Sequence, residues 1–514
     1  MSVSCFAAEL SDQINGSRGN VPIRAVLTDG AVTVEPTNVT KATSAELALQ
    51  RISSQPDHGT PDFLFNAGNS RGGETLFRWG GFRMSLVLRW GPQAITAAAT
   101  VLDDNEALIN GLADLFPQTD TIHLSPHLPE ISRQTESKMT TLFTPLKVGR
   151  VQLSHRIALA PLTRFRNDEI TLAPIVPLVK EYYAQRASEP GTLLISEATL
   201  ISPQAGAYYY VPGIWSEEQI AAWKQITDAV HEKGSYIYAQ LWALGRAADP
   251  KAMRAQPGAE NFEIVSSSPV PLDEGYETPR ALTEDEIQQY IKDYAQAAKN
   301  AVERAGFDGV ELHGANGFLI DQFTQTCVNQ RTDRWGGSVE NRSRFALEVT
   351  KAVIEAVGAD RTAIRFSPFS NYQNMGMPDA ERESTFAYLA RELAKLHVSF
   401  VHLIEPRVEG NMDVENPQGS LQFFLDAYAD ASPVVLAGGY KADNAKEAVE
   451  VRYKNRPVII AFGRAFIANP DLPYRIKKGV EFTPYDRDTF YNAKEARGYT
   501  DYPFSEGFVV GVKA

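Results

Sequence analysis

The chain has 514 residues, of which 43% are hydrophobic and 22% are charged, a composition typical of a globular protein with ample material for a large core. Its formal net charge of −13 and the lack of a Lys/Arg-rich run interleaved with aromatic residues argue against a nucleic-acid partner. The two cysteines cannot form a disulfide framework, and no Cys/His spacing suggests zinc, so we predict no metal site.

Residues 1–138 are rich in Ser, Thr, Asn, Gly and Pro and show little periodicity. They contain no catalytic motif, and the one helix that we expect there spans about residues 105–115. We therefore predict a poorly structured N-terminal extension, residues 1–138, before the folded domain of residues 139–514. Two alternatives are that Met139 is the natural start and the upstream segment an artefact of the gene model, and that the extension is a partner-binding module.

The start of the chain also predicts where the protein resides. MSVSCFAAEL lacks the basic start and apolar core of a signal peptide. The most apolar stretches, such as residues 94–102, fall far short of the roughly 20 residues that span a bilayer. We expect a cytoplasmic protein with no membrane partner.

From Met139 onward, short apolar runs alternate with amphipathic, helix-forming stretches. This alternation predicts a parallel sheet, and eight repeats favour a closed (β/α)₈ (TIM) barrel, an α/β fold. An open doubly wound sheet is the rival, but no glycine-rich nucleotide-binding fingerprint supports it. The expected strands are residues 156–163, 192–199, 235–242, 309–315, 362–368, 400–406, 433–439 and 457–464, and the longest helices are 216–233, 283–305, 339–357 and 382–396.

Polar residues gather where the strands end, which in a (β/α)₈ barrel is the active-site face. Gly438, Gly439 and Gly463 follow the last two strands, where backbone N–H groups commonly bind a phosphate. Arg464 can add charge-assisted bonds to that phosphate. A glycine pair is usually only a turn, so the prediction depends on the joint placement of these residues.

Three side chains near the first, third and fifth strands suit a flavin ring. Arg365 is a permanent cation that would stabilise the negative charge of the reduced ring. Gln240 carries both a donor and an acceptor for the pyrimidine edge, and Thr163 offers a hydroxyl to the ring's other carbonyl. The structural alternative for Arg365 is a buried ion pair.

His313 and Asn316 are separated by two residues after the fourth strand, so one turn of chain can direct both at one point. Two converging donors would stabilise the oxyanion that forms when hydride adds to an α,β-unsaturated carbonyl. A lone His at a strand end is more often structural, and here too the shared rim favours a functional role.

Long segments of the chain also resemble the old yellow enzyme family, particularly its fungal members. The resemblance runs from Leu142 to about Pro503. It is carried by LFTPLKVGRVQLSHRIALAPLTRFR, EYYAQRASEPGTLLISEAT, SPQAGAYYYVPGIWSEEQIAAW, AQLWALGRAADP, HGANGFLIDQF, NQRTDRWGGSVENRSRFALEV, IRFSPF, AFGRAFIANPDLPYRI and YDRDTFY.

The resemblance implies non-covalent FMN, NAD(P)H as reductant, and an enal or enone as small-molecule substrate. Flavin-contacting family positions match Pro161, Thr163, Ala198, Gln240 and Arg365, with Gly438, Gly439, Gly463 and Arg464 at the phosphate. His313 and Asn316 match the pair that binds the substrate carbonyl, and Tyr208, Trp242, Tyr372 and Tyr491 resemble positions that line the substrate pocket. The oligomeric state expected is monomer or homodimer.

The chain departs from the family at Phe318, where the family usually has the Tyr that protonates the substrate. Phe has no acidic proton, so either water or another Tyr supplies it, or reduction gives way to redox-neutral isomerisation of the double bond. A similar Phe occurs in ergot-alkaloid relatives, which suggests the tailoring of a fungal secondary metabolite. An alternative of another class is a flavin-binding protein without catalysis.

Overall fold

The structure is a computed structural model that describes residues 23–28, 31–36, 73–79, 82–90, 95–101, 140–410 and 412–513. The chain divides into two compact units, Met1–Thr135 and Glu136–Ala514.

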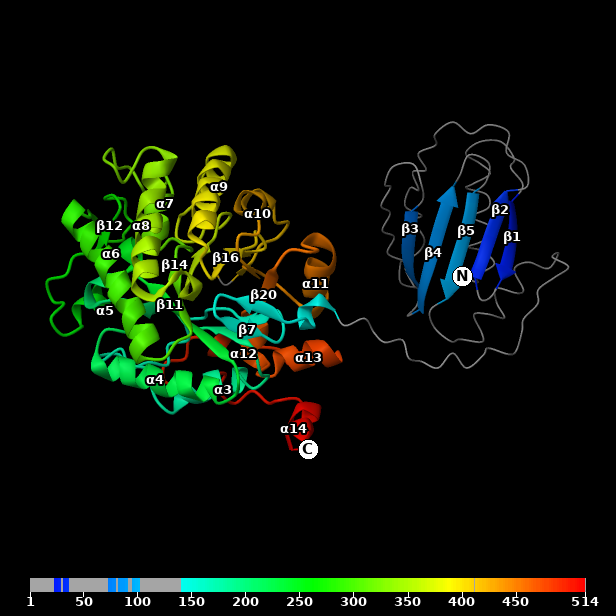
Figure 1. Ribbon diagram of the computed structural model, residues 1–514, viewed down its shortest axis with the longest axis horizontal. Helices are drawn as coiled ribbons and strands as arrows, with labels where there is room; N and C mark the ends of the chain where they lie inside the picture. The colour runs from blue at the N-terminus through cyan, green and yellow to red at the C-terminus, as the bar shows by residue number, and fades with distance from the viewer. Residues whose placement is uncertain are drawn as a thin grey trace. The chain divides into compact units, whose positions relative to one another are not determined.

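The first unit contains five antiparallel strands in the order β1-β2-β5-β4-β3. They are β1 (Ile23–Thr28), β2 (Ala31–Pro36), β3 (Gly73–Trp79), β4 (Phe82–Trp90) and β5 (Ile95–Val101), drawn in blue in Figure 1. Runs such as AVTVEP in β2 supply the β-branched residues that favour strands. The composition of the segment predicts less regular secondary structure than these strands represent. The helix expected at residues 105–115 lies outside the described residues, and the other expectations for this extension stay predictions.

The second unit is the predicted (β/α)₈ barrel. Its eight parallel strands are β8 (Ile157–Leu159), β9 (Leu193–Ile195), β11 (Tyr236–Trp242), β14 (Gly309–His313), β15 (Thr362–Phe366), β16 (Phe400–Ile404), β19 (Val434–Ala437) and β20 (Val458–Phe462). The sheet closes because β9 pairs with β8 on one side and with β11 on the other. All five residues of β14, β15, β16 and β20 are buried, as expected of parallel strands covered on both faces.

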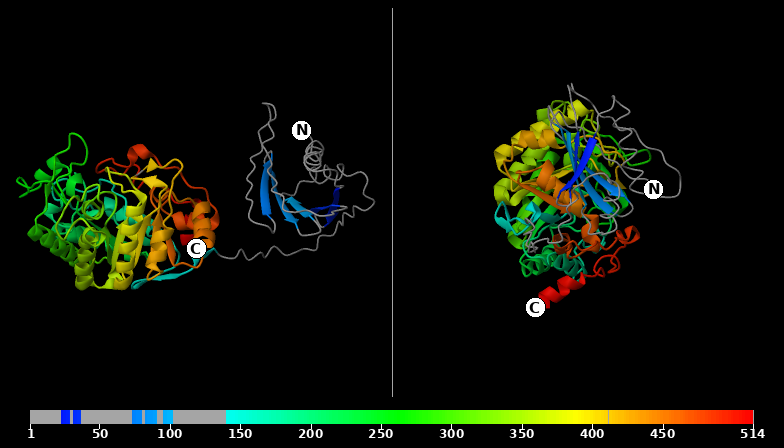
Figure 2. Two further views of the ribbon diagram at one scale, coloured as in Figure 1. Left: turned by 90° about the horizontal axis from the view of Figure 1, so that it is seen from above. Right: turned by 90° about the vertical axis from the view of Figure 1, so that its right-hand side faces the viewer.

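Helices cover the outside of the barrel, and Figure 1 shows α6, α8 and α9 following one another around it. The main helices are α3 (Leu178–Arg186), α4 (Glu217–His231), α6 (Glu284–Lys299), α8 (Val339–Val357), α9 (Asp379–Leu396), α10 (Gln422–Tyr428), α11 (Ala442–Glu447) and α13 (Leu472–Lys478). Capping boxes at Ser216/Gln219 and Thr283/Glu286 start α4 and α6 where the sequence predicts helices. The C-terminal helix α14 (Glu506–Lys513) projects from this unit in Figure 2.

All eight barrel strands are shorter than the predicted ranges, and the first two differ most. The first ends at Leu159, and Pro161, which follows closely, has no N–H to offer a ladder. The second is interrupted after Ile195 and resumes as β10 (Thr199–Leu200). The predicted helix 382–396 begins three residues earlier than expected, directly after Pro378.

A hairpin lies at the N-terminal end of the barrel. It consists of β6 (Leu146–Val148) and β7 (Val151–Leu153), whose apolar side chains share one buried cluster with inward residues such as Tyr238 and Phe400. A Cβ added at the hairpin's Gly149 would lie 2.0 Å from the carbonyl oxygen of Asp360, so only glycine permits this close approach. No described helix has the length and apolarity needed to cross a membrane.

Candidate functional site

Three aromatic rings meet at the C-terminal ends of β11 and β14. The ring centroids of Phe318 and His313 lie 4.8 Å apart, as do those of Phe318 and Trp242, and both pairs meet edge to face. Tyr208 approaches Trp242 from the far side, with ring centroids 5.7 Å apart. The structure therefore brings together four of the residues that the sequence assigns to the substrate side.

His313 is a neutral hydrogen-bond donor. Burial, with Arg365 and His402 nearby, holds the pKa of His313 well below its usual 6.5. The backbone N–H of Ala315 donates to Nδ1 of His313 at 3.4 Å, so Nδ1 is the acceptor nitrogen. The proton is therefore assigned to Nε2, which can donate to a ligand without giving its proton away.

Asn316 and Gly317 form a tight turn directly after the His313 strand. Both have positive φ, +57° for Asn316 and +77° for Gly317. The N–H of Asn316 donates to Oγ of Ser367 at 2.8 Å. A Cβ at Gly317 would lie 2.9 Å from Cβ of Gln373, so glycine is required here by both backbone and space.

Asp321 holds the same turn from within the short helix α7 (Leu319–Thr324). Its Oδ2 accepts the N–H of Gly317 at 2.9 Å, and its Oδ1 accepts from Nε2 of Gln325 at 2.8 Å. Burial raises the pKa of Asp321 from its usual 3.8 to about 7. The sequence reasoning did not single out this residue.

Below the rim, four polar side chains point into the barrel. Nε2 of Gln240 donates to Oε1 of Glu311 at 2.8 Å, and Nδ1 of His402 lies 2.8 Å from Oε2 of the same carboxylate. Arg365 stands between His313 and His402 in the strand register. Burial lowers the pKa of Arg365 to about 10, while Glu311 opposes that shift. Gln240 and Arg365 thus both lie near Glu311, and their contact with a flavin stays a prediction.

Two of the predicted phosphate residues, Arg464 and Gly439, lie near one carboxylate, that of Asp413. Arg464, at the start of α12 (Arg464–Ala468), pairs with Asp413, one of its Nη atoms lying 2.9 Å from Oδ2. A Cβ at Gly439 would lie 3.8 Å from Oδ1 of Asp413. Asp413 belongs to the hairpin of β17 (Val408–Glu409) and β18 (Met412–Asp413). A phosphate bound by Arg464 must share or replace this partner.

The remaining predicted residues take varied positions. Pro161 and Thr163 lie in the loop after β8, and Ala198 is buried between β9 and β10. Gly463 directly precedes α12, and Gly438 has φ +123° beside Glu405.

Of the two outer tyrosines, Tyr372 is 42% exposed and lies close to Gly410. Tyr491 is 49% exposed, with its ring 5.4 Å from that of Phe165. No described contact joins either tyrosine to His313.

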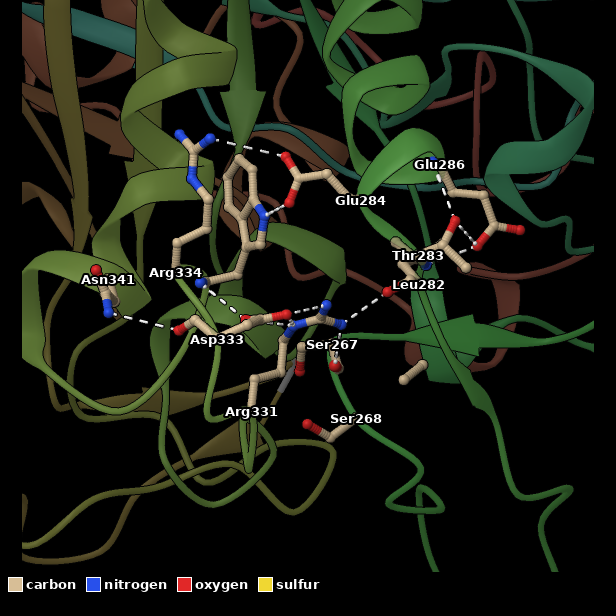
Figure 3. Close-up of polar contacts among 12 residues, drawn as sticks. Ser267, Ser268, Leu282, Thr283, Glu284, Glu286, Arg331, Asp333, Arg334 and Asn341 are labelled. Carbon is tan, nitrogen blue, oxygen red and sulfur yellow. Dashed lines mark hydrogen bonds and ion pairs between the residues drawn. The ribbon is translucent and has the colours of Figure 1, made fainter.

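One of the long motifs that resemble the old yellow enzyme family, residues 329–349, has a structural task. Arg331 donates to the carbonyl oxygens of Ser267 at 3.1 Å and Leu282 at 2.7 Å, and it also binds Asp333 (Figure 3). These bonds fasten the insertion that contains β12 (Val265–Ser266) and β13 (Arg280–Ala281) to the loop before α8. The motif therefore identifies the fold rather than the chemistry.

Comparison with known proteins decides the family. The family described as NADH:flavin oxidoreductase / NADH oxidase matches residues 141–482. The chain belongs to this family.

Curated relatives and solved structures of the NADH:flavin oxidoreductase / NADH oxidase family cover the same part of the chain. Chanoclavine-I aldehyde reductase fgaOx3 of Penicillium roqueforti (strain FM164) is 57% identical over 376 residues, covering 73% of this chain and 100% of its own. A protein of Epichloe festucae var. lolii named probable inactive reductase easA is 48% identical, covering 72% of this chain and 97% of its own. Among solved structures, Old Yellow Enzyme from Pichia sp. AKU4542 has a TM-score of 0.65 and 38% identity, covering 71% of this chain and 94% of its own.

Members of this family are flavin enzymes, and the residues at the rim fit a flavin. Two buried donors, Nε of Arg365 and Nε1 of Trp242, have no hydrogen-bond partner in the described part of the chain. Buried donors left unpaired carry a free-energy cost that a bound ligand can remove. A flavin ring, which is rich in hydrogen-bond acceptors, could accept from both of these donors if it bound at the mouth of the barrel.

Four polar residues at or near the candidate site were not predicted from the sequence: Glu311, His402, Asp321 and Asp413. A signal existed for two of them, because Glu311 and His402 are ionisable side chains inside apolar strand runs, as Arg365 is. Asp321 bonds to Gly317 and Gln325, each four positions away, and Asp413 pairs with Arg464 across 51 positions. Neither aspartate lies in a periodic apolar run that would mark it.

Proposed function

We propose that the barrel binds FMN, accepts electrons from NAD(P)H and acts on the C=C bond of an α,β-unsaturated carbonyl compound. The observation that carries this proposal is the neutral His313, whose Nδ1 accepts from Ala315 so that its proton is assigned to Nε2, beside the buried cation of Arg365. The family match supports the flavin and a nicotinamide reductant, since the family's description names NADH.

Bound FMN would supply the hydride that the substrate's β-carbon receives. That addition places negative charge on the carbonyl oxygen, and His313 and Asn316 supply two donors to it. Each such donor is commonly worth about 3 kcal/mol to the transition state. The bond from Ala315 to Nδ1 keeps His313 in the tautomer that donates from Nε2, and Ser367 holds the backbone of Asn316.

The proton for the α-carbon has another source than residue 318. Phe318 is 7% exposed and its side chain carries no ionisable group. Tyr208 is the nearest described alternative around Trp242, but its hydroxyl donates to the carbonyl oxygen of Ala247 at 2.6 Å and burial raises its pKa. Protonation therefore falls to water or, if that bond opens, to Tyr208.

The substrate proposed is an enal that belongs to a fungal secondary metabolite. One relative is named an aldehyde reductase. An aldehyde conjugated to a C=C bond is the class of substrate whose carbonyl oxygen two converging hydrogen-bond donors would activate. The aromatic side chains of Trp242, Phe318 and Tyr208 offer flat apolar walls to a ring-bearing substrate.

Phe318 also favours a second candidate, redox-neutral isomerisation. Without an acid at residue 318, the anionic intermediate of the substrate persists longer, and rotation or a shift of the double bond can precede return of the hydride. Relatives named probable inactive raise a third outcome, flavin binding without catalysis.

The test is to incubate the holoprotein with NADPH and an enal panel, comparing wild type with Phe318→Tyr. We expect the substitution to raise the rate of formation of saturated product by about 10²-fold or more, the usual contribution of a general acid. Phe482→Tyr is the matched control. Phe482 is partly buried and follows α13 in the chain, so this substitution adds the same hydroxyl at a position outside the proposed site.

Three results separate the candidates. NADPH consumed in proportion to saturated product by the wild type supports the reductase. Catalytic NADPH with an isomeric product supports the isomerase. A bound flavin that NADPH does not bleach supports neither enzyme and leaves flavin binding alone.

A further inference from the structure

The barrel contains a buried carboxylate, Glu311, that the proposed chemistry does not use. Its side chain is 0% exposed, and so is that of its partner His402. A charge at this depth is costly unless it is paired and hydrogen-bonded, so its partners indicate what it does.

One partner is Gln240, which lies directly opposite Glu311 in the register of β11 and β14. Nε2 of Gln240 donates to Oε1 of Glu311 at 2.8 Å. A carboxylate only accepts, so the amide nitrogen of Gln240 must face it and the amide oxygen must face away. Glu311 thereby fixes which end of the Gln240 amide meets a ligand.

The second effect of Glu311 is on charge. Burial lowers the pKa of Arg365, and the nearby carboxylate of Glu311 acts in the opposite direction and raises it. The neighbouring His313 and His402 are both neutral at pH 7, because burial lowers the pKa of each. Glu311 is thus the group in this cluster that offsets the positive charge of Arg365.

We propose that Glu311 is a positioning residue that holds the Gln240 amide and moderates the charge of Arg365, and thereby sets the balance of affinity between oxidised and reduced FMN. This inference rests on the proposed function, since it presumes that FMN binds above these residues. Glu311 would then tune the flavin although no sequence motif distinguishes this residue.

The first variant is Glu311→Gln, which preserves size and removes the charge. With Arg365 no longer offset, the site should favour the negatively charged reduced flavin by about tenfold over the oxidised form. A tenfold change corresponds to a midpoint potential about 30 mV more positive for a two-electron couple. The readouts are the potential of bound FMN, by equilibration with a reference dye, and the Kd of FMN, by quenching of flavin fluorescence.

Glu197→Gln is the matched control, since Glu197 is equally buried, accepts from Asn167 at 3.1 Å and has no bond to Gln240. It should leave the potential and the Kd as in the wild type. Glu311→Asp retains the charge but withdraws the carboxylate from Gln240, so it should raise the Kd of FMN severalfold while the potential stays close to that of the wild type.

Equal potentials for wild type, Glu311→Gln and Glu197→Gln would overturn the inference. If Glu311→Gln does not fold, Glu311→Asp decides the matter, and an unchanged Kd in that variant overturns it too. Failure of the wild type itself to bind FMN would instead refute the proposed function on which the inference stands.

Discussion

Replacing Asp321 by Asn should change how the stability of the protein depends on pH. Asp321 is 0% exposed and accepts hydrogen bonds from Gly317 and Gln325. Its pKa is about 7 in the folded protein, against 3.8 for an ordinary Asp. Asn has almost the same volume and does not titrate.

The sign and size of the effect follow from these two pKa values. The folded protein keeps the proton of Asp321 up to about pH 7, while the unfolded chain releases it near pH 3.8. The contribution of Asp321 to stability is therefore fully present below pH 3.8, is lost as the pH rises through 7, and changes no further above that. The loss is about 1.4 kcal/mol per pH unit in this window, or about 4 kcal/mol in all.

The amide side chain of the Asp321→Asn variant carries one acceptor oxygen for the two donors that Asp321 satisfies, so the variant loses one buried hydrogen bond, at a cost of about 1–3 kcal/mol. We expect Asp321→Asn to be less stable than the wild type at pH 4.5 and as stable or more stable at pH 8.

The assay is urea unfolding at pH 4.5, 6 and 8 and at one fixed FMN concentration, followed by tryptophan fluorescence and circular dichroism. Asp285→Asn is the control, because it makes the same substitution at an exposed position near the start of α6. The reasoning is refuted if the stability difference for Asp321→Asn is constant between pH 4.5 and 8, or if the variant gains on the wild type as the pH falls.

Two further predictions concern FMN affinity and the fold separately. Asp413→Asn should tighten FMN binding by up to about fivefold in a fluorescence titration. The exposed ion pair between Asp413 and Arg464 contributes about 0–1 kcal/mol, and without it the carboxylate no longer competes with the phosphate for Arg464. A weaker or equal affinity would contradict this. Arg331→Met should lower the free energy of unfolding by about 1–3 kcal/mol, since two carbonyl oxygens lose their donor, and should leave the Kd of FMN unchanged. A large loss of FMN affinity in that variant would show that the motif of residues 329–349 serves the site as well.

The barrel could be predicted from the sequence because its signal is repeated. Each strand is a buried apolar run, and helical segments follow the strands. A capping residue marks the start of some of these helices, as at Ser216 and Thr283. Rim residues such as His313 and Arg365 could be predicted too, since parallel strands all present their C-terminal ends to the same face. The family resemblance and the assignment as an oxidoreductase are confirmed by the comparisons.

What the sequence could not show depends on contacts between distant segments. The bonds of Glu311 join strands about 70 and 90 positions away, and nothing local indicates which side chains will meet. Asp413 reaches Arg464 across 51 positions, from a hairpin too short to have a periodic pattern. The early end of β8 was signalled by Pro161, whose missing N–H was a local cue that the strand prediction overlooked.

The backbone conformation at Phe318 places few demands on the side chain there, although the ring itself packs against His313 and Trp242. Phe318 is the residue immediately before α7, with extended backbone at φ −86° and ψ 178°, and its side chain makes no bond to the helix end. The helix is instead held by Asp321 and its neighbours, so exchange of the side chain at residue 318 leaves the backbone scaffold intact. Evolution could therefore add or remove a proton donor here in a single step, and a family built on this barrel can change its product without first acquiring compensating mutations elsewhere.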